Sequence, residues 1–134
     1  MIVEKDDLMP ILTPEDVVRV RREVRTQAIA VGFSLVDQTK IITAASEIAR
    51  NTIDYGGGGT LRIAALRKGL HRGVRLTFTD QGPGISDIKL ALTDGYSSGS
   101  GLGLGLGGAK RLSSEFDIQS TPGKGTIVTL ARWK

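Results

Sequence analysis

The most informative stretch of this 134-residue sequence is Gly101-Leu102-Gly103-Leu104-Gly105-Leu106-Gly107-Gly108. A flexible linker fits it poorly, because leucines alternate with the glycines and a helix is predicted to follow, from Leu104 to Phe116. Each glycine disfavours a helix by ~1 kcal/mol, so a run of glycines at a helix entrance indicates a role for them. Backbone N–H groups at a helix N-terminus bind anions, and the stretch therefore predicts a phosphate-binding loop.

A polar segment rich in glycine and serine, residues 93–103, leads into these glycines and is predicted to be a mobile loop. Because no strand precedes them, their match to the dinucleotide-binding pattern G-x-G-x-x-G is rejected. A Walker A motif is excluded, since Ala109-Lys110-Arg111 lacks the required lysine followed by serine or threonine. The H-R-D and D-F-G motifs of eukaryotic-type protein kinases are missing as well.

Glu47 and Asn51 stand four residues apart in a helix predicted from Ser34 to Ile53, so both side chains project from one side of it. Such a pair often belongs to a solvated helix face. Here, however, two apolar residues lie between them, and the glycine run Gly56–Gly59 begins soon afterwards. Glu47 and Asn51 are therefore candidate functional residues.

Asp80 ends a predicted strand, Val74–Thr79, and is followed by Gln81-Gly82-Pro83-Gly84. Asp and Gly favour turns whatever the function, so a simple strand-ending turn is one interpretation. The other is a carboxylate at the floor of a pocket, where it accepts a hydrogen bond from an exocyclic amino group and the glycines let the chain pass close to a flat ligand. The residues alone leave both interpretations open.

The remaining segments predict an α+β fold in a single domain, residues 1–134: a two-layer sandwich with helices on one face of a mixed, mostly antiparallel sheet. His71 is placed in a turn between strands. The expected elements are an edge strand within 2–12, a helix from 13–16 to Gly32, strands 60–66 and 74–79, a short helix 86–92, and a hairpin of 116–121 and 126–133.

Composition excludes several classes of protein. The chain has no cysteine and one histidine, which excludes disulfides, thiolate metal sites and most metal centres. The net charge of +4 is compatible with a nucleotide or an acidic partner, whereas 4% aromatic residues argue against nucleic-acid binding. No apolar stretch reaches the ~18 residues of a membrane span and no signal peptide is recognisable, so a cytoplasmic protein without a membrane contact is expected.

Four motifs in this order resemble the GHKL ATPase and kinase superfamily, which has the Bergerat ATP-binding fold. They are Glu47-x-x-x-Asn51, Asp80-x-Gly82-x-Gly84, Gly101-Leu102-Gly103-Leu104-Gly105-Leu106 and Gly125-Thr126. Within the superfamily, the sequence resembles the RsbT-type serine/threonine kinases of the stressosome. The resemblance covers nearly the whole chain.

The resemblance implies ATP and Mg²⁺ as ligands. It implies that Asn51 is the Mg²⁺ ligand, that Asp80 binds the adenine amino group, and that Thr126 makes a second contact near the adenine. Glu47 would be the general base that takes the proton of the acceptor hydroxyl. Among the glycines, Gly82 and Gly84 would let the chain approach the base, and Gly101, Gly103 and Gly105 would belong to the ATP lid.

The resemblance also implies partners. Acceptors in that family are STAS-domain proteins, and a large STAS scaffold holds the kinase until stress. The released kinase activates a downstream effector, often a PP2C-type phosphatase. Asp54 stands where sensor histidine kinases often carry lysine, and no dimerising helix pair or phosphorylated histidine is recognisable, so a serine or threonine on a separate protein is the expected acceptor.

Two other functions remain open. One is an anti-sigma factor of the same fold, which phosphorylates its antagonist and sequesters a sigma factor. The other is a nucleotide-gated binding module without transfer activity. Arg19, Arg22 and Arg25 give the first predicted helix a basic outer side, which is either a solvated face or a docking surface.

Overall fold

A computed structural model describes residues 1–85, 87–92 and 105–134. Its centre is a five-stranded sheet with the order β1-β2-β3-β5-β4, in which all four neighbouring pairs are antiparallel. The predicted mostly antiparallel sheet and the edge position of its first strand are confirmed. The strands are β1 (Ile2–Ile11), β2 (Gly59–Lys68), β3 (His71–Asp80), β4 (Glu115–Ser120) and β5 (Thr126–Trp133).

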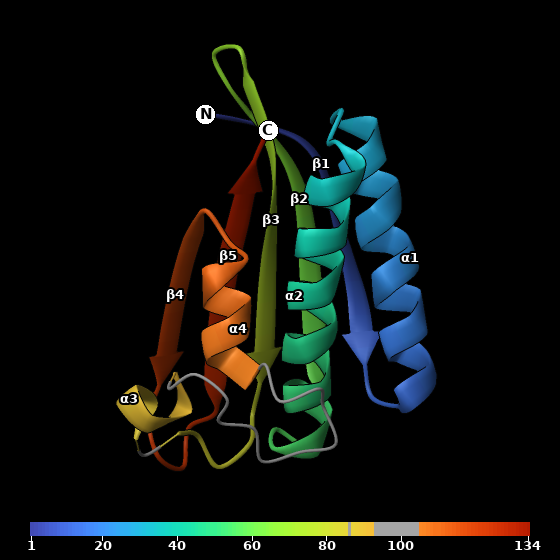
Figure 1. The fold of residues 1–134 in the computed structure, drawn as a ribbon. Coiled ribbons are helices and arrows are strands. Elements are labelled where there is room, and N and C mark those ends of the chain that lie inside the picture. Colours follow the sequence, from blue (N-terminus) through green and yellow to red (C-terminus); the bar gives the residue numbers. More distant parts are fainter. Residues whose placement is uncertain (86, 93–104) are drawn as a thin grey trace.

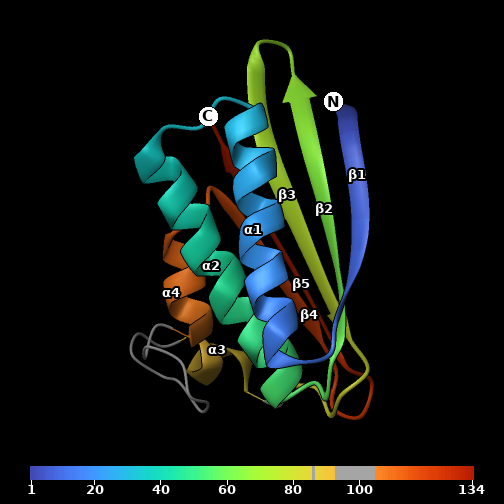
Figure 2. The same cartoon turned by 90° about the vertical axis from the view of Figure 1, so that its right-hand side faces the viewer.

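The described helices all lie on one face of the sheet, which confirms the two-layer sandwich (Figures 1 and 2). They are α1 (Pro14–Ala30), α2 (Leu35–Asp54), α3 (Ile88–Ala91) and α4 (Gly105–Arg111). In Figure 1, α2 stands between α1 and α4. None of the helices in the described part of the chain is long and apolar enough to cross a membrane.

The core fills the space between the sheet and the helices. Ile63, Leu76 and Leu130 lie opposite one another on β2, β3 and β5 and are at most 1% exposed. Val24 of α1 and Ile48 of α2 are buried in the same cluster. Burying one such side chain contributes about 1.5–3 kcal/mol. Side chains alternate between the two faces of a strand, and the helix-free face carries Arg75 and Thr77 of β3 together with the buried Ala64 and Leu66 of β2.

Short-range polar contacts set where the two long helices begin. The Asp16 carboxylate accepts hydrogen bonds from the N–H groups of Leu12 and Thr13, at 2.8 and 3.2 Å, and pairs with Arg19. These contacts, the Leu12 N–H first, lower the pKa of Asp16. The Ser34 hydroxyl accepts from the Asp37 N–H and caps α2.

Two sequence predictions need correction. The helix expected from Leu104 to Phe116 ends at Arg111, because the Ser113 hydroxyl bonds back to Ala109 O and the Ser114 N–H turns to Ala131 O of β5. Phe116 accordingly belongs to β4, and Leu104 lies outside the described residues. His71 is not in the turn but is the first residue of β3, where it pairs with Lys68.

Candidate functional site

Asp80 is the last residue of β3 and pairs with Gly59 of β2 and Thr126 of β5. Its Oδ1 accepts a hydrogen bond from the Gly82 N–H at 2.9 Å, which fixes the turn after the strand. In the described part of the chain, Oδ2 of this half-buried carboxylate has no hydrogen-bond partner. One acceptor therefore remains available to a ligand.

Glycines let the backbone pack closely around Asp80. A Cβ on Gly56 would lie 2.5 Å from Asp80 Cγ, and one on Gly82 would lie 2.6 Å from Gly56 Cα. Gly84 has φ +79°, and its Cβ would lie 2.4 Å from Thr121 O. Contacts within the protein thus explain why Gly82 and Gly84 are glycines, and their role beside an adenine stays a prediction.

Thr126 is buried on β5 beside Asp80, and a small hydroxyl network surrounds it. Its Oγ1 lies 2.8 Å from Ser120 Oγ, which also accepts from the Ile85 N–H at 2.7 Å and contacts Gly125 O at 3.1 Å. Ser120 therefore ties the loop after β3 to the β4–β5 hairpin. Asp80, Gly82, Gly84 and Thr126 come together at this end of the sheet.

Glu47 and Asn51 both lie on α2, as the sequence predicts. Glu47 is only 3% exposed, and its Oε1 lies 3.2 Å from Arg50 Nη1. Because a buried carboxylate without a partner is costly, this ion pair offsets part of the cost of burying Glu47. Asn51 is half-buried one turn further along, just before the point where Gly56 contacts Asp80.

The glycine-rich stretch is only partly within the described residues. Gly105 is the first residue of α4, with φ +56°, and is buried. The residues that follow it, as far as Ala109, are also buried, and α4 packs against α2 (Figure 1). The predicted lid residues Gly101 and Gly103 lie outside the described residues, so the lid remains a prediction.

One arginine holds the two helices of the site to the sheet. Arg132 of β5 donates through Nη2 to Asp37 Oδ1 of α2 at 2.7 Å and through Nη1 to Leu112 O, just after α4, at 2.8 Å. The hydrogen bonds from Arg132, and then the bond with Ser34, hold the pKa of Asp37 below its ordinary value. Arg132 therefore connects the first turn of α2 and the residue after α4 to the sheet.

The residues present fit a bound nucleotide. Asp80 Oδ2 is an unused carboxylate oxygen and Thr126 supplies a hydroxyl next to it, while Asn51 offers an amide oxygen on the adjoining helix. Across residues 1–85, 87–92 and 105–134, no group of three or more His, Cys, Asp or Glu side chains forms a metal site. A Mg²⁺ ion here would be bound by few protein groups together with phosphate oxygens and water.

Sequence reasoning missed three residues of this region: Arg50, Gly56 and Ser120. The position of Arg50, three residues after Glu47, is a usable signal, because residues three apart meet on a helix. Gly56 looks like part of a helix-ending run in the sequence, although it packs against Asp80. Nothing in the local sequence marks Ser120, because its partner Ile85 lies 35 residues away along the chain.

Comparison with known proteins identifies the family of the chain. Residues 36–134 match the family described as histidine kinase-, DNA gyrase B- and HSP90-like ATPases. The chain is 42% identical over 123 residues to the serine/threonine-protein kinase RsbT of Bacillus subtilis, with 92% of each chain covered. It is also 31% identical over 98 residues to the anti-sigma F factor of a Thermoanaerobacter species, covering 69% of this chain and 68% of that one.

The fold also has solved counterparts. The RsbU and RsbW domains of a Mycobacterium tuberculosis protein superpose with a TM-score of 0.66 at 23% identity. The match covers 97% of this chain and 33% of that one, so this chain corresponds to about a third of the larger protein. The protein belongs to the histidine kinase-, DNA gyrase B- and HSP90-like ATPase family. Within it, the chain is an ATP-using serine/threonine-protein kinase similar to RsbT.

Proposed function

We propose that this kinase transfers the γ-phosphate of Mg-ATP to a serine or threonine of a STAS-domain partner protein in a bacterial stress-signalling, partner-switching pathway of the stressosome type. The observation that carries the proposal is that buried Glu47 precedes Asn51 by one turn on α2. Just after this helix, Gly56 packs against Asp80, whose Oδ2 is unused in the described part of the chain. The similarity to RsbT over 92% of both chains supports the class of reaction.

In this proposal each residue has one task. Asp80 Oδ2 would accept the hydrogen bond of the adenine amino group, with Thr126 beside it. Asn51 would help to hold Mg²⁺, which would neutralise phosphate charge. Glu47 removes the proton of the acceptor hydroxyl while the oxygen of that hydroxyl bonds to the γ-phosphorus and the bond from that phosphorus to the β,γ-bridging oxygen breaks. Mg-ATP supplies the phosphoryl group, together with the metal charge that neutralises the phosphates. The protein contributes by positioning the reacting groups.

The proposal also places the kinase in a cytoplasmic signalling pathway. Residues 1–134 act as one kinase domain in the cytoplasm, and a STAS scaffold restrains the kinase until stress releases it toward an effector such as a PP2C-type phosphatase. A second candidate function is that of an anti-sigma factor kinase, which the 31% identity to an anti-sigma F factor supports. Co-purification with a sigma subunit would favour the second function over the first.

The test is a single-turnover assay with saturating Mg-ATP and a serine-bearing STAS domain. Glu47→Gln keeps a hydrogen bond toward Arg50 but removes the base, so we expect transfer to slow by about 10²–10⁴-fold. ATP affinity, measured by calorimetry on the same variant, should stay within about threefold of wild type because the residue acts after binding. Near wild-type transfer would remove Glu47 as the base, and a wild-type protein that binds ATP without any transfer would leave a nucleotide-gated binding module.

The Mg²⁺ assignment has its own test. Asn51→Ala should weaken ATP binding about tenfold in the presence of Mg²⁺, the loss expected for one metal ligand of few. With a chelator present, wild type and variant should bind ATP equally. An identical response of the two proteins to Mg²⁺ would contradict the assignment.

A further inference from the structure

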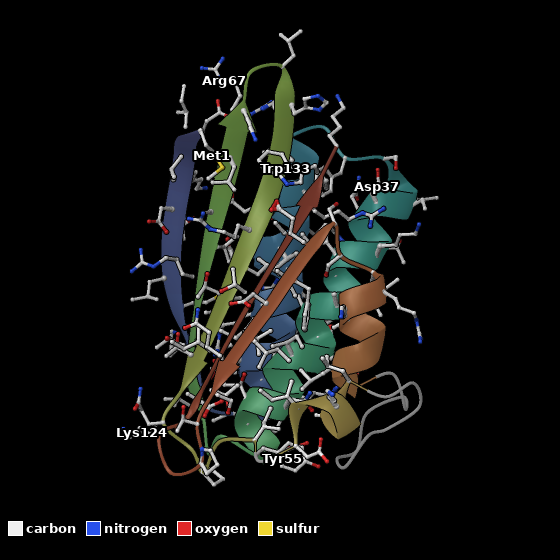
Figure 3. The ribbon with its side chains drawn as sticks, turned by 90° about the vertical axis from the view of Figure 1, so that its left-hand side faces the viewer. Met1, Asp37, Tyr55, Arg67, Lys124 and Trp133 are labelled. Atoms are coloured by element: carbon white, nitrogen blue, oxygen red, sulfur yellow. The ribbon has the colours of Figure 1, made fainter. Side chains whose placement is uncertain are left out.

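A hollow lies at the opposite end of β3 from Asp80. It has a volume of about 460 Å³ and is lined by Lys68, Gly69, His71, Glu115 and Trp133. Because β3 has 10 residues, the two ends are about 30 Å apart at ~3.3 Å per residue. Figure 3 shows Arg67 and Trp133 at this end and Tyr55 and Lys124 at the other. The hollow is therefore separate from the candidate nucleotide site.

Trp133 faces away from the helices. The neighbouring Arg132 points to Asp37 of α2, so the alternation of a strand directs Trp133 to the helix-free face. The indole lies over Gly73, where a Cβ would be 2.7 Å from Trp133 Cε3. Its Nε1 donates to Glu115 Oε1 at 2.7 Å. This tryptophan is half-buried and held in place before any partner arrives, as in preorganised binding sites.

Basic groups without an acidic partner surround this tryptophan on the same face. Lys68 and His71 pair with each other in register, and Arg75 follows His71 by four residues, so all three share the face of Gly73 and Trp133. Within the described residues none of the three forms an ion pair. The acid of the hollow, Glu115, is already hydrogen-bonded to the indole.

We propose that this surface, defined by Lys68, His71, Arg75 and Trp133, binds an acidic segment of a partner protein that carries one large apolar side chain. The apolar side chain packs on Trp133 in the hollow, and the carboxylates approach the three basic groups. Lys68 and His71 line the hollow, and Arg75 lies outside its lining on the same face. So few basic groups suit a short acidic segment rather than nucleic acid, whose affinity comes from many phosphate contacts. The proposal does not depend on kinase activity.

The chain contains one tryptophan, so its fluorescence reports directly on this surface. The probe is an acetylated peptide of glutamates and aspartates with one central phenylalanine. We expect a saturable change in Trp133 fluorescence with a Kd of about 10–500 µM, the weak range of small interfaces. Replacing the phenylalanine by alanine, or the acids by glutamine, should each weaken binding about tenfold or more.

Lys68 and Arg67 provide a matched pair of variants. Both are exposed neighbours on β2, but they point to opposite faces. Lys68→Glu should weaken peptide binding about three- to tenfold, whereas Arg67→Glu, with the same change in net charge, should have less than about half that effect. ATP affinity, measured by calorimetry, should be unchanged in both.

The proposal would be overturned by no saturable fluorescence change, by equal weakening in both variants, or by equal binding of the peptide without acids. Tighter binding of a single-stranded oligothymidine than of the acidic peptide, lost in Lys68→Glu, would also overturn it and make the surface a nucleic-acid site. Failure of these tests leaves the proposed kinase function untouched, because the hollow is remote from Asp80.

Discussion

The two ends of β3 are built in different ways. At the Asp80 end, Gly56, Gly82 and Gly84 bring backbone against backbone, with no room for a Cβ. At the His71 end, a Cβ on Gly69 would have nothing within 4 Å, and Leu70 is fully exposed. The first end fixes a carboxylate within close packing, whereas the second presents free side chains on a protruding hairpin (Figure 1).

The two ends of β3 should therefore respond differently to substitution. Glycine substitutions at the Asp80 end should change stability and nucleotide binding together, because the close backbone contacts also position the Asp80 carboxylate. Substitutions in the exposed turn of the hairpin, at Gly69 and Leu70, should change only what the exposed side chains touch. Three predictions test this contrast, in order of decreasing effect.

The largest effect is expected from Gly82→Ala, whose Cβ would lie 2.6 Å from Gly56 Cα and 2.9 Å from Tyr55 O. Overpacking against backbone should lower the free energy of unfolding by about 2–3 kcal/mol. ATP binding should fall as well, because the Gly82 N–H holds Asp80. Urea denaturation followed by circular dichroism, with calorimetric ATP titration, provides the measurement.

Gly69→Ala is the matched control at the hairpin end. Its φ of +61° is unfavourable for alanine, which should cost only about 1 kcal/mol, and ATP affinity should not change. A larger destabilisation in Gly69→Ala than in Gly82→Ala would contradict the contrast between the two ends.

Asp80→Asn should keep the fold, because an amide oxygen still accepts from the Gly82 N–H, but should weaken ATP binding. Losing a hydrogen bond to a charged acceptor costs about 1.5–3 kcal/mol, hence about ten- to more than a hundredfold in affinity. Calorimetry with ATP and with GTP measures it. Equal affinity of the wild type for both nucleotides would contradict the adenine-binding role of Asp80.

The smallest effect is expected from Asp37→Asn. This variant tests the ion pair between Asp37 and Arg132, which connects α2 to β5 near the hairpin end. Losing the charge that faces Arg132 should cost about 1 kcal/mol at neutral pH, because the carboxylate is part-exposed. The pKa of Asp37 is lowered in the folded protein from its ordinary 3.8. Its ionised form therefore stabilises the fold fully above that value, and the contribution is lost as pH falls through the lowered pKa.

The difference in unfolding free energy between wild type and Asp37→Asn should thus be constant from pH 7 to about 5 and shrink below about pH 4. Urea denaturation at a series of pH values measures this. Asp117→Asn, an exposed acid of β4 without an ion pair in the described part of the chain, is the control and should show little change. A gap that widens on acidification would contradict the assignment.

The sequence alone determined most of the fold. Helical spacing of apolar residues marked α1 and α2, alternation marked β2, β3 and β5, and glycines marked where elements stop, because these patterns are local. The local pattern does not predict the end of α4, because the Ser114 N–H bonds to Ala131 O of β5, and this contact between distant segments prevents the helix from continuing. His71 was misplaced because its pairing with Lys68 extends the hairpin further than composition indicates.

For the candidate site, the sequence predicts which residues carry the chemistry: Glu47, Asn51 and Asp80 stand out by type and spacing. Only the tertiary structure decided how they are held. The pairing of Glu47 with Arg50, the packing of Gly56 on Asp80 and the bond from Ile85 to Ser120 join segments through space. The physical reason is that periodicity records which face a side chain occupies, whereas burial and hydrogen-bond partners are set by packing between elements distant in sequence.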